Sequence, residues 1–165
     1  MARILVVGGG CRGRELAGWL TAQGHAARIT TRSRETCAEI ERAGAECWPG
    51  TPGRLATLRG SLDGVGVACW LLAGARGPLE ELEELHTSRL GFFLTQMIDT
   101  TVRGFVYEAR GNTPAAEALA QGEEIARRLC ERNVIPLRVL DREAQDGAPW
   151  QQQARSAIEE LLSGS

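Results

Sequence analysis

Residues 3–13 read RILVVGGGCRG, and this stretch decides the fold. The short continuous apolar run Arg3–Val7 is typical of a strand buried on both faces of a parallel sheet. Three glycines follow it, and residues 11–23 then place their apolar side chains on one helical face before Gly24. The stretch therefore predicts a strand, a glycine-rich turn and the start of a helix.

The same alternation continues along the chain. Strands are predicted over residues 27–31, 46–48, 65–72, 105–109 and 134–140, and helices over residues 33–43, 52–62, 79–100, 113–132 and 149–162. Pro136 places the last strand at a sheet edge or at a bulge. We therefore predict an α/β fold, a doubly wound parallel sheet of about six strands with helices on both faces. The length predicts one domain over residues 1–165.

Composition excludes several classes of function. The net charge of −2 and the ordinary apolar fraction of 43% do not favour nucleic acid as a partner. No apolar stretch approaches the roughly 20 residues that span a bilayer, and the start of the chain lacks the features of a signal peptide. We expect no membrane partner and a cytoplasmic location. All 19 basic residues are Arg, which excludes any mechanism that needs a lysine amine.

The five cysteines are odd in number and contain no CxxC spacing. This argues against a disulfide framework and against a zinc site, and we predict no metal site. Most of the cysteines are expected to be small buried apolar residues. Cys11, beside Arg12 at the start of a predicted helix, is either a reactive thiol or simply a small residue that fits there.

Gly8, Gly10 and Gly13 match the pattern GxGxxG between the first predicted strand and helix. In such a turn the first glycine permits the tight bend, the second lets the backbone approach a pyrophosphate, and the third lets helix and strand touch. Free N–H groups at the start of the helix then face the phosphates. We predict a dinucleotide site; the alternative is a glycine-rich turn that binds nothing. A Walker-type phosphate loop is excluded because its Lys is absent.

The end of the second predicted strand indicates which dinucleotide binds. A carboxylate there accepts hydrogen bonds from the ribose of NAD, whereas Arg accommodates the additional phosphate of NADP. This chain has Thr31, Arg32, Ser33 and Arg34 in that place. The segment favours NADP over NAD; the alternative is that both arginines lie on a solvated helix start.

Residues 6–33, 43–75 and 122–140 resemble, in order, the nucleotide-binding half of atypical or extended short-chain dehydrogenases/reductases, of the NmrA-like or epimerase-like kind. The first segment begins VVGGGCRGRE and the second ends ACWLLAGA. The resemblance implies that Arg12 and Arg32 contact the phosphate of NADP and that residues 72–74 pass its ribose. Motif and resemblance together predict as cofactor-binding residues Gly8, Gly10, Cys11, Arg12, Gly13, Thr31, Arg32, Ser33, Arg34, Leu72, Ala73 and Gly74.

The chain departs from this family where the family carries out its chemistry. Gly50, Thr51 and Pro52 stand where relatives have an Asp that contacts the adenine. The family uses a Tyr and a nearby Lys in the helix after the fifth strand, together with a Ser at the end of that strand. Here the only tyrosine, Tyr107, lies inside the predicted strand, and the chain has no Lys. The usual dehydrogenase mechanism is therefore excluded.

Three functions stay open from the sequence. The first is an NADP-binding module that responds to the cofactor or regulates, without turning over a substrate. The second is a small reductase or epimerase-like enzyme that uses Glu108, Arg110, a bound water or a partner's substrate site, although these two residues could equally form an internal ion pair. The third is a domain that binds no nucleotide and serves only in assembly.

The predicted helix over residues 79–100 contains LGFFLTQMI, which is more apolar than a one-sided helix needs. In relatives this helix packs in a dimer interface, so we expect a homodimer through it, with a wide core stripe as the alternative. Of the two histidines, His25 is expected in the loop before the second strand and His86 at the surface of this helix.

Overall fold

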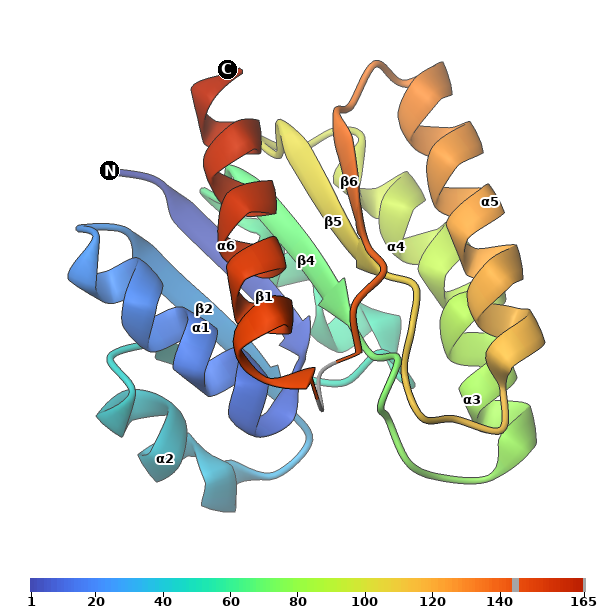
Figure 1. Ribbon diagram of the computed structural model, residues 1–165, viewed down its shortest axis with the longest axis horizontal. Helices are drawn as coiled ribbons and strands as arrows, with labels where there is room; N and C mark the ends of the chain where they lie inside the picture. The colour runs from blue at the N-terminus through green and yellow to red at the C-terminus, as the bar shows by residue number, and fades with distance from the viewer. Residues whose placement is uncertain (144–145, 165) are drawn as a thin grey trace.

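The computed structural model describes residues 1–143 and 146–164, and this part of the chain contains a six-stranded parallel sheet. Its strands are β1 (Arg3–Gly8), β2 (Ala26–Thr31), β3 (Glu46–Pro49), β4 (Val67–Leu71), β5 (Gly104–Glu108) and β6 (Leu137–Leu140). They lie in the order β3-β2-β1-β4-β5-β6 (Figure 1). The predicted doubly wound α/β fold is confirmed, and the strand order reverses between β1 and β4.

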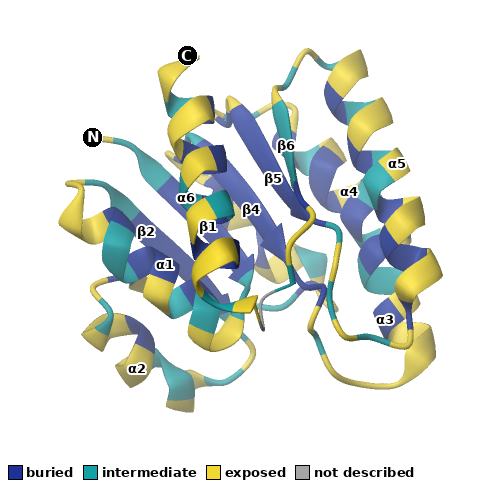
Figure 2. Cartoon of the chain, in the orientation of Figure 1, coloured by how far each residue is buried: buried dark blue, intermediate teal, exposed yellow. Residues whose placement is uncertain are grey.

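Helices cover both faces of the sheet. They are α1 (Gly10–Ala22), α2 (Cys37–Arg42), α3 (Leu79–His86), α4 (Ser88–Met97), α5 (Ala116–Arg132) and α6 (Ala148–Ser163). One apolar cluster joins the sheet to α1, α2 and α6, and a second joins the opposite face to α4 and α5. Because both faces are covered, β4 and β5 are buried along their whole length (Figure 2). No helix in the described part of the chain is long and apolar enough to cross a membrane.

Residues 79–100 form two helices rather than the single predicted one. The backbone breaks at Thr87, whose φ of −122° and ψ of −90° are not helical. Next to the break, His86 has its Nδ1 3.0 Å from the Tyr107 hydroxyl oxygen and its Nε2 3.3 Å from the Leu72 carbonyl oxygen. The expectation of a surface His86 is wrong, since the residue is 2% exposed. Burial lowers the pKa of His86 to about 4, so the ring is neutral at pH 7.

Two other segments differ from their predictions. Residues 52–62 form two short 3-10 helices, η2 (Leu55–Thr57) and η3 (Arg59–Leu62), in place of one helix. The sixth strand begins only at Leu137, because Pro136 has no N–H to donate to the ladder. β6 lies at the edge of the sheet, which confirms the first of the two positions that Pro136 predicts.

The cysteines follow their expectation only in part. Cys69 and Cys130 are buried and free, as expected, whereas Cys11 is exposed. Cys37 and Cys47 form a disulfide across Cα atoms 5.3 Å apart. The expectation of no disulfide is therefore wrong for this pair. Cys37 is the first residue of α2, and Cys47 lies in β3. The short connection between α2 and β3 brings the two cysteines close together.

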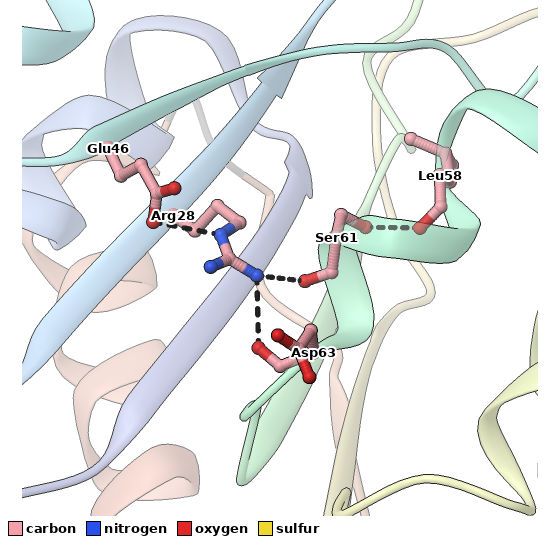
Figure 3. Close-up of polar contacts among 5 residues, drawn as sticks. All are labelled: Arg28, Glu46, Leu58, Ser61 and Asp63. Atoms are coloured by element: carbon pink, nitrogen blue, oxygen red, sulfur yellow. Dashed lines mark hydrogen bonds and ion pairs between the residues drawn. The ribbon is translucent and has the colours of Figure 1, made fainter.

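The Arg28 side chain fixes the segment between β3 and β4, in which two 3-10 helices replace the predicted helix. Its side chain is 7% exposed, and its Nε donates to Glu46 Oε2 over 2.9 Å. Its Nη1 donates to the carbonyl oxygens of Ser61, over 2.6 Å, and Asp63, over 3.2 Å (Figure 3). The guanidinium carbon also lies 5.2 Å from the ring centroid of Trp48. One buried side chain thus ties β2, β3 and η3 together.

We expect Arg28→Ala to lower the free energy of unfolding by about 2–4 kcal/mol, because it leaves the buried Ser61 carbonyl oxygen without its donor and removes a packed guanidinium. Urea denaturation measures this. The control is Arg138→Ala, since Arg138 pairs with Glu160 over 2.7 Å with both side chains about half exposed. That variant should lose at most about 1 kcal/mol. Equal losses in the two variants would contradict the role given to Arg28.

Candidate functional site

A cavity of about 720 Å³ lies at the carboxyl ends of the strands, where the strand order reverses. This is the place where open parallel sheets bind ligands, and the volume is typical of a small-molecule site. The cavity is lined chiefly by residues 8–10, 29–32, 50–53, 71–72 and 74–76, by part of α3 and by Glu108. In Figure 1 the loops that follow the strands gather at the lower edge of the sheet.

The glycine-rich loop shapes one wall of this cavity. A Cβ at Gly8 would overlap the Leu72 side chain, and one at Gly13 would lie 3.1 Å from the Gly8 carbonyl oxygen. These two glycines therefore allow the chain to pack on itself. Gly10 differs, because it has a φ of +51° and a Cβ there would meet nothing within 4 Å. The backbone at Gly10, where α1 begins, is thus bare toward open space and presents the free N–H groups of a helix start.

Arginines line the cavity at the end of β2. Arg32 is exposed and makes no ion pair with any described residue, whereas Arg14 pairs with Glu39 over 3.4 Å. Both side chains line the cavity, beside Thr31 and Thr36, whose hydroxyl groups are hydrogen-bonded to each other. The acidic residues that line the cavity come from elsewhere, namely Glu81 and Glu84 of α3 and Glu108 of β5. The β2 end therefore offers positive charge to an anion.

The structure separates the predicted cofactor-binding residues into two groups. Gly8, Gly10, Thr31, Arg32, Leu72 and Gly74 line the cavity, whereas Cys11, Arg12, Gly13, Ser33, Arg34 and Ala73 do not. The Arg12 guanidinium instead pairs with Glu15 over 3.2 Å. The predictions missed Arg14. Its spacing in the sequence could have revealed it, because Arg14 lies four residues after Gly10 and therefore on the same face of α1.

Glu108 at the end of β5 is 3% exposed and accepts two hydrogen bonds. Its Oε1 accepts from the Ala73 N–H over 2.9 Å, and its Oε2 accepts from Trp150 Nε1 over 2.8 Å. Burial raises the pKa of Glu108 to about 7, although both hydrogen bonds act in the opposite direction. The group forms no ion pair with Arg110 or any other described residue, so the internal ion pair considered from the sequence is not formed.

Tyr107 lies outside the cavity. Its hydroxyl group donates to the Leu119 carbonyl oxygen over 3.1 Å and fits against α5 at Gly122, where a Cβ would overlap it. Burial raises the pKa of Tyr107 well above its usual value. Near the end of β3, Gly50, Thr51 and Pro52 line the cavity without a carboxylate. Within residues 1–143 and 146–164 there is no group of three or more His, Cys, Asp or Glu side chains placed to hold a metal ion.

Solved structures of similar fold include a short-chain dehydrogenase/reductase superfamily protein from Agrobacterium tumefaciens with bound NAD, with a TM-score of 0.68 and 18% identity over 83% of this chain and 48% of that chain. UDP-glucose 4-epimerase from Thermotoga maritima, with UDP-glucose, gives a TM-score of 0.68 and 14% identity over 83% of this chain and 54% of its own. Triphenylmethane reductase from Citrobacter sp., complexed with NADP(H), gives a TM-score of 0.60 and 20% identity over 83% of this chain and 48% of its own.

These neighbours confirm, at the level of the fold, the resemblance to short-chain dehydrogenases/reductases seen in the sequence. This chain spans about half the length of each of them. Sequence comparison with protein-family models and with curated proteins finds no match.

Glu108→Gln should reveal the buried carboxyl group in the pH dependence of stability. The pKa of Glu108 is about 7 in the folded chain and 4.5 ordinarily, so its favourable contribution is complete below pH 4.5 and is lost as the pH rises through 7. The stability of the native chain minus that of the variant should therefore fall by about 2–3 kcal/mol from pH 4.5 to pH 8. Denaturant unfolding at several pH values measures this difference. A constant or rising difference would contradict the assignment.

Proposed function

We propose that this chain binds a nicotinamide dinucleotide in the cavity at the carboxyl ends of its strands. The observation that carries the proposal is Gly10, whose bare backbone at the start of α1 faces open space. A pyrophosphate there would meet free N–H groups and the positive end of the helix dipole. Neighbours of the same fold with bound NAD or NADP(H) support this choice of ligand.

The dinucleotide we propose is NADP rather than NAD. Arg32 and Arg14 line the β2 end of the cavity, and among the described residues no carboxylate lines it there to accept bonds from an unphosphorylated ribose. A guanidinium forms short, charge-assisted hydrogen bonds with phosphate oxygens. Arg12 and Arg34, which do not line the cavity, would assist only through the field of their charges.

The role we propose is a cofactor-responsive or regulatory module that turns over no substrate. The chain has no Lys, and its only tyrosine is buried outside the cavity. A second candidate is a small reductase or epimerase-like enzyme. It is favoured by one observation, a buried carboxyl group at the cavity wall, Glu108, whose pKa of about 7 suits a general acid or base.

Two further predictions from the sequence remain part of this proposal. A homodimer through α3 and α4 draws support from Phe92, which is 63% exposed on α4. A cytoplasmic location also stays a prediction, and the disulfide between Cys37 and Cys47 is the feature that bears against it, because disulfides persist mainly in oxidising compartments.

Gly10→Ala tests whether the pyrophosphate binds at the start of α1. A methyl group at Gly10 would enter the space where the backbone approaches the pyrophosphate, so we expect NADPH binding to weaken by at least about tenfold in calorimetric titration. Gly24→Ala is the matched control, because Gly24 has a φ of +87°, open space within 4 Å of where a Cβ would lie and no place in the cavity lining. Both variants should lose about 1 kcal/mol of stability. Equal binding by both would overturn the assignment of the site.

Arg32→Ala tests the choice of dinucleotide. We expect it to weaken NADPH binding by about tenfold and to leave NADH binding unchanged, because only NADPH carries the additional phosphate. Arg34→Ala is the control, since Arg34 is also exposed but does not line the cavity. Tighter binding of NADH than of NADPH by the unaltered chain, or a larger loss in Arg34→Ala, would contradict the role of Arg32.

A further inference from the structure

The two halves of the sheet contribute unequally to the cavity. A doubly wound sheet consists of two mononucleotide-binding halves, here β1 to β3 and β4 to β6. Residues at the ends of all three strands of the first half line the cavity. From the second half, the lining comes from residues 71–72 and 74–76, from α3, from Arg89 of α4 and from Glu108, and no described residue of α5, β6 or α6 takes part. The described cavity therefore covers the ends of β1 to β3 and reaches β4 and β5, but it stops at Glu108 and does not extend to β6 or α6.

The first turn of α6 occupies the place beyond β5 and β6. Trp150 is fully buried and packs in the same apolar cluster as Val106 of β5 and Leu140 of β6. Gln151, which is 4% exposed, donates through Nε2 to the Arg12 carbonyl oxygen over 3.0 Å. In Figure 1 this turn of α6 lies beside the start of α1, at the same edge of the sheet as the glycine-rich loop.

Three side chains, Glu108, Trp150 and Gln151, form what we call the α6 clasp. Glu108 accepts from the Ala73 N–H, which follows β4, and from Trp150 Nε1. Gln151 then joins α6 to the first turn of α1. The clasp thus joins α6 to the ends of β4 and β5 and to the first turn of α1. A nucleotide could extend beyond Glu108 toward β6 only by breaking these buried hydrogen bonds and exposing Trp150.

We propose that the cavity holds only the adenosine half of the dinucleotide, a nucleoside with 2′- and 5′-phosphates, and that the nicotinamide half lies outside it. This rests on the proposed function and specifies the part of the ligand that the protein recognises. The cationic corner at Arg32 and Arg14 meets the 2′-phosphate, and the start of α1 at Gly10 meets the 5′-phosphates. Because the redox-active ring makes no contact with the cavity, the chain binds NADP⁺ and NADPH equally.

One polar atom of the α6 clasp would favour binding of the nicotinamide half. Gln151 Oε1 is buried and has no hydrogen-bond partner, so it could accept from the carboxamide of a nicotinamide. That contact would require the first turn of α6 to move, because Gln151 does not line the cavity. An added affinity from the nicotinamide half is accordingly the result that distinguishes the two arrangements.

The test is a calorimetric titration of the unaltered chain with adenosine 2′,5′-bisphosphate, NADP⁺, NADPH and nicotinamide mononucleotide. We expect the first three to bind with dissociation constants within about threefold of one another and the mononucleotide not to bind. Arg32→Ala should weaken adenosine 2′,5′-bisphosphate by about tenfold, with Arg34→Ala as the unaffected control, which places the bisphosphate at the β2 end.

The outcomes separate this inference from the proposed function. Binding of NADP⁺ or NADPH at least about tenfold tighter than the bisphosphate, or a similar preference between the two oxidation states, overturns the half-site and leaves dinucleotide binding intact. Binding of none of the four overturns dinucleotide binding, and the half-site with it. Binding of the nicotinamide mononucleotide alone would place the site in the second half of the sheet and overturn both.

Discussion

The contact between the glycine-rich loop and the end of β4 is the constraint on which the site depends. Gly9 N–H donates to the Leu71 carbonyl oxygen over 2.8 Å, and Gly8, with a φ of +84°, leaves no room for a Cβ beside Leu72. This contact joins β1 to β4 at the point where the strand order reverses. It also fixes where α1 starts, because Gly13 then packs under Gly8 and the first turn of the helix faces the crevice. A side chain at Gly8 would therefore disturb the sheet and the site together.

The distribution of charge around the crevice matters more than the net charge of −2. Arg14 and Arg32 lie at the β2 end, whereas the acidic lining residues belong to α3 and β5. Glu84 is partly neutralised by Arg89 at 3.7 Å, and Arg14 by Glu39 at 3.4 Å. Arg32, and Arg76 on the side of α3, line the cavity without an ion pair to any described residue. Because every basic residue is Arg, the positive charge persists at any physiological pH and is carried by a planar, bidentate donor.

The sequence predicts the sheet well because parallel strands that are buried on both faces are continuous apolar runs, a pattern that the central strands β1 and β4 follow closely. It also predicts the tight bend at Gly8 and the close contact of α1 with β1 at Gly13, since both depend on local chain geometry. Tertiary packing decides the rest. The apolar pattern over residues 79–100 continues across Thr87, so it does not reveal the break or the burial of His86. Likewise, the pairing of Cys37 with Cys47 follows from the course of the chain from α2 to β3 and has no signature in their spacing.

The polar groups at the end of β5 are held in fixed hydrogen bonds. Adjacent residues in a strand point to opposite faces, so Tyr107 packs under α5 while Glu108 turns toward α6. The hydrogen of the Tyr107 hydroxyl is donated to a backbone carbonyl, and both Glu108 oxygens accept from fixed donors. A proton transfer through either group would have to break a buried hydrogen bond that also holds two elements together. The contacts that fill the space beyond Glu108 therefore hold these polar groups in fixed hydrogen bonds, which supports the proposed binding module over the alternative enzyme.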